Sequence, residues 1–217
     1  MNQGKILYIF DPLCGWCYPM ADVINKSITK YSNDFDFEII SGGMVLGERA
    51  GKIGEKFAYV NDAYKSVESH TGAKFGPAFL KELEKGELMM SSLEPSIALQ
   101  VVKELDPSSA FKFAHSLQNA LYFDGIDLTS FDNLLKIAKD NNVDENDFTD
   151  LYNSEDYSRK TLSDFEFASK LGVNGFPTIL LEKNQEYYLI ARGYQHFIDL
   201  NNIFRKIIKS NEETVEN

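Results

Sequence analysis

The two cysteines of this 217-residue chain, Cys14 and Cys17, lie two residues apart, between a short apolar segment and a helical pattern. Residues 5–10 (KILYIF) are β-branched and aromatic, which predicts a buried strand. Pro12 ends this strand because proline cannot donate to a sheet. From Gly15 onward apolar residues recur every four residues, which predicts a helix. The pattern therefore places both sulfurs at the beginning of a helix that follows a buried strand.

This position favours redox chemistry. The free N–H groups and positive dipole of a helix N-terminus stabilise a thiolate, so we expect Cys14 to be an exposed nucleophile and Cys17 a buried resolving thiol. A zinc site needs four ligands, whereas the chain has no third cysteine and its histidines (His70, His115, His196) lack metal-ligand spacing. Two inert core cysteines are the other alternative, but the strand–Cys-x-x-Cys–helix context favours a redox pair.

The remaining pattern predicts an α/β fold with a large all-helical insertion. Residues 34–41 predict a second strand, and helical signals then dominate as far as Leu171. Residues 176–182 and 187–192 predict a hairpin, which a last amphipathic helix follows. The outer β-α-β and β-β-α pieces, 1–46 and 172–217, should form one four-stranded sheet with helices on its faces. Residues 47–171 should form an inserted helical domain.

Composition excludes several partners. The net charge is −11, which argues against sequence-independent binding of nucleic acid and against docking on an anionic membrane. No segment has the length and apolar character of a membrane span or of a signal peptide's core. We therefore expect a cytoplasmic protein.

Pro177 stands immediately before the predicted strand at 178, in the segment VNGFPTILL. One interpretation is an ordinary trans proline at a strand start. The other is a cis peptide bond after Phe176. The residues alone leave both open.

The segments FDPLCGWCY and GFPT together resemble the thioredoxin superfamily. The long helical insertion is similar to that of the DsbA-like thiol–disulfide oxidoreductases, and DPLCGWCY most resembles their FrnE-like subgroup. The resemblance implies a thioredoxin fold. It also implies that Cys14 is the nucleophile, that Cys17 resolves, and that Pro177 is a cis-proline facing their disulfide. Phe176 would then turn its backbone toward the substrate.

The implied activity is a protein disulfide oxidoreductase or isomerase that works through a mixed disulfide on Cys14. It requires no metal and no cofactor besides the Cys14–Cys17 disulfide. The expected partners are cysteine-containing proteins or peptides, with glutathione as a further candidate. Gly15 and Trp16 stand where the related periplasmic oxidases carry Pro-His, so the direction of the redox reaction is open. We expect both residues to contact the substrate.

Two alternative functions remain. One is a glutathione-dependent enzyme acting on small molecules, of the 2-hydroxychromene-2-carboxylate isomerase or kappa-class transferase type, although those typically keep one reactive Ser or Cys. The other is a binding protein or chaperone that uses a groove beside Pro177. For Asp11 a turn-forming role is favoured over help with the Cys17 proton. For Met89 and Met90 core packing is favoured over a place in a peptide groove.

Overall fold

The structure is a computed structural model that describes residues 3–215, and the side chains of residues 3–210. A four-stranded sheet lies at its centre, in the order β2-β1-β5-β6. β1 runs parallel to β2, whereas β5 is antiparallel to both β1 and β6. These strands are β1 (Lys5–Phe10), β2 (Asp36–Ser41), β5 (Thr178–Lys183) and β6 (Glu186–Arg192). The predicted four-stranded sheet and thioredoxin-type fold class are confirmed.

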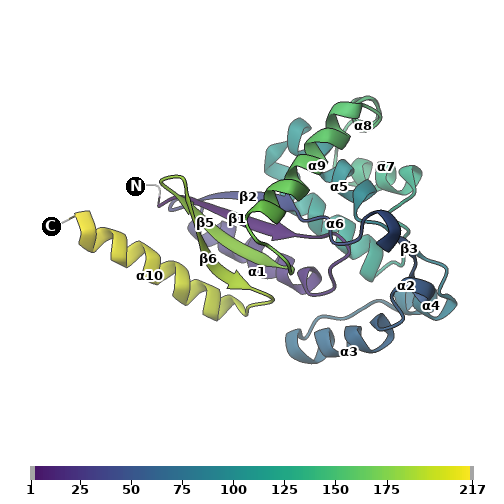
Figure 1. Ribbon diagram of the computed structural model, residues 1–217, viewed down its shortest axis with the longest axis horizontal. Helices are drawn as coiled ribbons and strands as arrows, with labels where there is room; N and C mark the ends of the chain where they lie inside the picture. The colour runs from purple at the N-terminus through teal and green to yellow at the C-terminus, as the bar shows by residue number, and fades with distance from the viewer. Residues whose placement is uncertain (1–2, 216–217) are drawn as a thin grey trace.

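Side chains of β1 alternate between the two faces of the sheet. Ile6, Tyr8 and Phe10 belong to the main core, which includes residues of α1 (Cys17–Tyr31) and α10 (Phe197–Val215). Leu7 and Ile9 instead pack with a residue of α9 (Glu155–Lys170) on the other face. Helices thus cover both faces of the sheet (Figure 1). The alternation places Tyr8 on the same face as Cys17.

The chain between β2 and β5 is mainly helical. Its longer helices gather at the end of the sheet opposite the two chain ends (Figure 1). They are α5 (Leu93–Leu105), α6 (Ala110–Tyr122), α7 (Phe131–Asp140), α8 (Glu145–Tyr152) and α9. Three helices precede them along the chain, namely α2 (Ile53–Lys56), α3 (Val60–Thr71) and α4 (Pro77–Lys85).

The expectation of an all-helical insertion is wrong in one detail. Two short strands, β3 (Gly51–Lys52) and β4 (Met89–Met90), pair antiparallel within it. Each has two residues, which is too short to produce a period-two pattern in the sequence. Across residues 3–215, the structure has no helix with the length and apolarity that a membrane crossing requires.

Candidate active site

The loop from β1 to α1 carries both cysteines in two consecutive turns. The N–H of Cys14 donates to the carbonyl of Asp11 at 3.0 Å, and the N–H of Cys17 donates to the carbonyl of Cys14 at 2.9 Å. The helix begins at Cys17 rather than at Gly15 as predicted. Cys14 therefore lies in the turn that leads into α1, ahead of its first residue.

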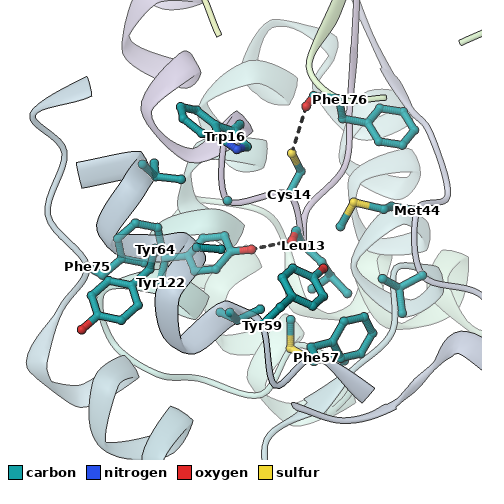
Figure 2. A pocket seen from close by; sticks show the side chains of 16 residues that line it. Leu13, Cys14, Trp16, Met44, Phe57, Tyr59, Tyr64, Phe75, Tyr122 and Phe176 are labelled. Carbon is teal, nitrogen blue, oxygen red and sulfur yellow. Dashed lines mark hydrogen bonds between the residues drawn. The ribbon is translucent and has the colours of Figure 1, made fainter. Parts of the chain in front are cut away.

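The two thiols are both buried. Cys17 is 0% exposed, as expected, but Cys14 is only 5% exposed, so the prediction of an exposed Cys14 is wrong. Aromatic side chains explain the difference, because Phe75, Tyr122 and Phe176 line the same cavity as Cys14 (Figure 2). Burial, together with the adjacent Cys14 sulfur, raises the pKa of Cys17 well above its ordinary value.

Phe176 faces Cys14 from the segment just before β5. The Phe176–Pro177 peptide bond is cis, as the resemblance implied. The Cys14 Sγ donates a hydrogen bond to the Phe176 carbonyl oxygen at 3.3 Å (Figure 2). The Phe176 ring lies where a side chain at Gly42 would be, since a Cβ built there would come within 1.9 Å of the ring. Glycine at position 42 is therefore required for the position of Phe176.

A cavity of about 220 Å³ opens beside Cys14. Among the described residues, its lining contains no Lys, Arg, His, Asp or Glu side chain. α3 contributes Val60, Ala63, Tyr64 and Val67, whose spacing places them on one helix face. The other lining residues are Leu13, Cys14, Gly15, Trp16, Met44, Val45, Phe57, Tyr59, Phe75, Met90, Tyr122 and Phe176.

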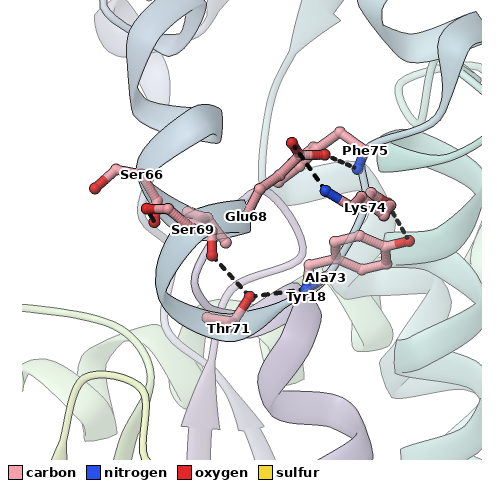
Figure 3. Close-up of polar contacts among 9 residues, drawn as sticks. Tyr18, Ser66, Glu68, Ser69, Thr71, Ala73, Lys74 and Phe75 are labelled. Atoms are coloured by element: carbon pink, nitrogen blue, oxygen red, sulfur yellow. Dashed lines mark hydrogen bonds and ion pairs between the residues drawn. The ribbon is translucent and has the colours of Figure 1, made fainter.

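Polar contacts fix the segment that follows α3 (Figure 3). The Glu68 carboxylate accepts a hydrogen bond from the Phe75 N–H at 3.0 Å and forms an ion pair with Lys74 at 3.7 Å. The Tyr18 hydroxyl of α1 donates to the Lys74 carbonyl at 3.4 Å. These contacts hold the ring of Phe75 at the wall of the cavity.

Asp11 is more than the turn-forming acid that the sequence favoured. Its carboxylate is fully buried and accepts hydrogen bonds from Leu13 N–H (2.9 Å), Met44 N–H (2.7 Å) and the Ser92 hydroxyl (2.8 Å). Burial raises its pKa to about 6, although the hydrogen bonds oppose that rise. Asp11 therefore joins the Cys14 loop, the segment after β2 and the beginning of α5.

Two buried tyrosines lie near the thiols. The Tyr122 hydroxyl donates to the Leu13 carbonyl oxygen (Figure 2). The Tyr8 hydroxyl is buried without a nitrogen or oxygen partner within the described part of the chain. Burial first, and then the charges of Cys17 and Cys14, raise the pKa of Tyr8. The sequence analysis assigned neither tyrosine to the site.

The structure brings together most of the residues that the sequence marked. Cys14, Gly15, Trp16 and Phe176 all line the cavity, whereas Cys17 and Pro177 are buried and do not line it. Met90 is both buried and part of the lining, and Met89 is partly exposed.

The histidines do not form a metal site. The ring of His70 contacts Trp16 edge-on at 5.8 Å, His115 lies on α6 and His196 precedes α10. The described residues contain no cluster of three His, Cys, Asp or Glu side chains that could hold a metal.

The part of the site that sequence reasoning missed is the face of α3. Val60, Ala63, Tyr64 and Val67 have the i, i+3, i+4, i+7 spacing that marks an apolar helix face. That spacing could have been found in the sequence, but nothing in it indicates that this face covers Cys14.

Residues 7–198 match the family model described as thioredoxin, so the chain belongs to the thioredoxin family. A protein from Nitrosomonas europaea, described as a candidate protein disulfide isomerase, has the same fold with a TM-score of 0.83. It is 26% identical, and the alignment covers 95% of this chain and 98% of that one. The resemblance to DsbA-like oxidoreductases is thereby confirmed, while membership of the FrnE-like subgroup stays a prediction.

The cytosolic disulfide reductase DsbM from Pseudomonas aeruginosa, which has also been solved with GSH, shares the fold. Its TM-score is 0.74 at 22% identity, with 86% of this chain and 89% of that chain covered. Among curated relatives, the ClpXP adapter protein SpxH of Bacillus subtilis is 22% identical over 82% of this chain. The chain spans 58% of the length of that relative.

Proposed function

We propose that this chain is a dithiol oxidoreductase that exchanges disulfides with proteins or peptides through a mixed disulfide on Cys14. The observation that carries the proposal is the contact between Cys14 and the segment that contains the cis Phe176–Pro177 bond. The Cys14 sulfur lies 3.3 Å from the Phe176 carbonyl oxygen. Cys17 stands one turn behind Cys14, where its thiol can reach the Cys14 sulfur. An incoming sulfur bonded to Cys14 would lie between the thiol pair and this segment.

The exchange conserves atoms and electrons. The Cys14 thiolate attacks one sulfur of a substrate disulfide, which forms the mixed disulfide and releases one substrate thiolate. Cys17 then loses its proton and attacks the Cys14 sulfur, which forms the Cys14–Cys17 disulfide and releases the second substrate thiolate. The enzyme has given up two electrons, and the two thiol protons end on the substrate thiols. The same steps in reverse oxidise a substrate dithiol.

Two comparisons support the choice of compartment and partner. The reductase DsbM is cytosolic by its own description, which agrees with a cytoplasmic location for this chain. Relatives described as ClpXP adapters act together with other proteins, which favours proteins over small molecules as partners. In a reducing cytoplasm the Cys14–Cys17 pair rests mainly as thiols unless its reduction potential is unusual.

The glutathione-dependent isomerase or transferase has less support. Glutathione carries two carboxylates, and the cavity beside Cys14 offers no cationic side chain to hold them. The presence of both cysteines also favours exchange through a pair.

The Cys17→Ala variant tests the proposal. Without the resolving thiol, a disulfide exchanger accumulates a mixed disulfide on Cys14, which mass spectrometry after acid quenching detects. An isomerase that uses glutathione as a carrier instead continues to turn over. The second experiment is a redox titration of the natural chain in glutathione buffers. We expect one reversible two-electron transition. The absence of a reversible disulfide would refute the proposed function.

A further inference from the structure

The hydroxyl of Tyr8 is a buried polar group held in a fixed position on β1. Tyr8 is 2% exposed. Its ring stacks on Phe10, with the ring centroids 5.8 Å apart, and on Phe111, with the centroids 6.5 Å apart. Its hydroxyl has no nitrogen or oxygen partner among the described residues. Leaving a buried hydroxyl without a partner costs free energy, and a catalytic role is one reason for a native protein to retain such a group.

The groups that act on this hydroxyl are the two sulfurs. Cys17 acts on it by charge and by hydrogen bonding, and Cys14 acts on it by charge. Burial first, and then these charges, raise the pKa of Tyr8 well above its ordinary value. The hydroxyl therefore keeps its hydrogen at neutral pH and can offer it to the Cys17 sulfur.

Cys17 is the sulfur that needs a hydrogen-bond donor. Its side chain has no contact with solvent, and burial is the first cause that raises the pKa of its thiol. The resolving step requires the thiolate of Cys17. A hydrogen bond with the Asp11 backbone lowers the pKa of Cys17, but the Asp11 carboxylate has no hydrogen to donate when it is ionised. A second donor at the sulfur would increase the thiolate population.

The second buried tyrosine of the site differs from Tyr8 in this respect. The charge of Cys17 also acts on Tyr122. The Tyr122 hydroxyl, however, already donates its hydrogen to the Leu13 carbonyl oxygen. The hydrogen of the Tyr8 hydroxyl has no such acceptor.

We propose that Tyr8 is a catalytic residue whose hydroxyl donates a hydrogen bond to the Cys17 sulfur and stabilises its thiolate in the resolving step. The proposal rests on the proposed function and adds a residue to the same site. In the reverse reaction the same hydrogen bond stabilises Cys17 as it leaves the Cys14–Cys17 disulfide. Tyr8 keeps its own proton throughout, so the proton of Cys17 still ends on the released substrate thiol.

Tyr8→Phe tests the proposal, because it removes the hydroxyl and keeps the stacked ring. A hydrogen bond to a charged group changes the thiolate population about 10- to 100-fold, so the ¹³Cβ chemical shift of Cys17 should titrate about one to two pH units higher in the variant. The titration starts at pH 7, where Asp11, with a pKa of about 6, is mostly ionised. The other titratable groups around Tyr8 and Cys17 are Cys14, Tyr122 and His115.

Stopped-flow reaction with 2,2′-dithiodipyridine separates the two exchange steps, since each step releases one thiopyridone. The first step, at Cys14, should change by less than about two-fold in Tyr8→Phe. The second step, at Cys17, should slow about three- to ten-fold at pH 7. The rate falls less than the thiolate population does, because a more basic thiolate is the stronger nucleophile.

Tyr31→Phe is the matched control, because it removes another buried tyrosine hydroxyl, which donates to the Asn201 side chain at 2.8 Å. Both exchange steps and the Cys17 titration should stay as in the natural chain. The free energy of unfolding in urea should fall for Tyr31→Phe and should not fall for Tyr8→Phe, whose hydroxyl has no nitrogen or oxygen partner to lose. Tyr8→Leu also lacks the hydroxyl and replaces Tyr8→Phe should that variant fail to fold.

Two results would overturn the role of Tyr8. An unchanged Cys17 titration together with a loss of stability in Tyr8→Phe would mean that the hydroxyl binds a water instead. The cavity of about 10 Å³ that Tyr8 lines with His115 and Gln118 is at the lower limit for one water. Equal slowing of both exchange steps would mean that Tyr8 only supports the fold around the thiols.

The natural chain separates this proposal from the proposed function. If it forms the Cys14–Cys17 disulfide and Tyr8→Phe matches it in both steps, the role of Tyr8 is wrong and the oxidoreductase remains. If the natural chain never forms this disulfide, the proposed function fails, and the Cys17 titration alone then decides whether Tyr8 donates to that sulfur.

Discussion

At the scale of single residues, Asp11 differs most from its expected role. A carboxylate that follows a strand ordinarily forms a turn in solvent. Here it is completely buried and accepts hydrogen bonds from three segments of the chain. The folded protein thus keeps an ionisable group in its interior, and folding stability must depend on the state of that group.

Asp11→Asn tests this dependence. The pKa of Asp11 is 3.8 in the reference state and about 6 in the folded protein. Because the folded state holds this proton more tightly, stability from Asp11 is present below pH 3.8 and is lost as the pH rises through 6. The loss amounts to about 3 kcal/mol. Between pH 4 and pH 7 most of this loss occurs, so urea unfolding should show the natural chain losing about 2 kcal/mol more stability than Asp11→Asn. Equal changes in both proteins would contradict the prediction.

Sequence analysis found the site residues that belong to a recognisable motif. It missed the residues whose role comes from their contacts in the folded protein. Cys14, Cys17 and Pro177 stand out because spacing and neighbours mark them. Gly42 could be interpreted only as the end of a strand. Its requirement comes from the ring of Phe176, which reaches it from the other end of the chain. Such a constraint exists only in three dimensions.

At the scale of elements, α3 and the segment after it control access to Cys14. One residue of α3 is buried, so few apolar contacts hold the helix in place. The hydrogen bond from the Phe75 N–H to the Glu68 carboxylate ties the following segment back to α3 (Figure 3). The ring of Phe75 then stays at the cavity wall and restricts access to the thiol.

Glu68→Ala should open this segment. A hydrogen bond of this kind contributes about 1 kcal/mol, so its loss should raise the rate of Cys14 alkylation by iodoacetamide about five-fold. Glu68→Gln retains an acceptor for the Phe75 N–H and should react at close to the natural rate. The measurement is quenched-flow labelling followed by mass spectrometry of the Cys14 peptide. Identical rates for Glu68→Ala and the natural chain would show that this segment does not restrict access.

Periodicity predicted the elements better than their ends. The strand expected at residues 5–10 has those bounds as β1, because its apolar run is short and Asp11-Pro12 ends it. The first helix begins two residues later than expected, since the N–H groups of Cys14 and Cys17 form turns instead. β3 and β4 could not be predicted, because two residues carry no pattern and their pairing depends on the fold around them.

At the scale of the whole molecule, the order of elements predicted the sheet but not how the insertion covers the thiols. The β-α-β and β-β-α pieces follow from local pattern, and the pairs within them, β1 with β2 and β5 with β6, follow from short connections. The pair that joins the pieces into one sheet, β1 with β5, spans the whole insertion. The position of α3 over Cys14 depends on long-range contacts. One of these is the hydrogen bond from the Tyr18 hydroxyl to the Lys74 carbonyl, which a single sequence does not reveal.

The net charge of −11 affects which substrates reach Cys14. Glutathione disulfide is anionic and is repelled by the protein, so added salt should increase its rate of reaction as the screening length falls from about 30 Å at 0.01 M to about 8 Å at 0.15 M. We expect the rate of mixed-disulfide formation on Cys14 to rise about two- to five-fold over this range. A peptide disulfide without net charge is the matched control. Its rate should stay constant, because the charged protein does not repel an uncharged substrate and salt therefore has no repulsion to screen. Acid quenching of Cys17→Ala at a series of salt concentrations measures both rates. If the two substrates shared one salt dependence, the effect would arise from the protein's own conformation rather than from repulsion of the anion.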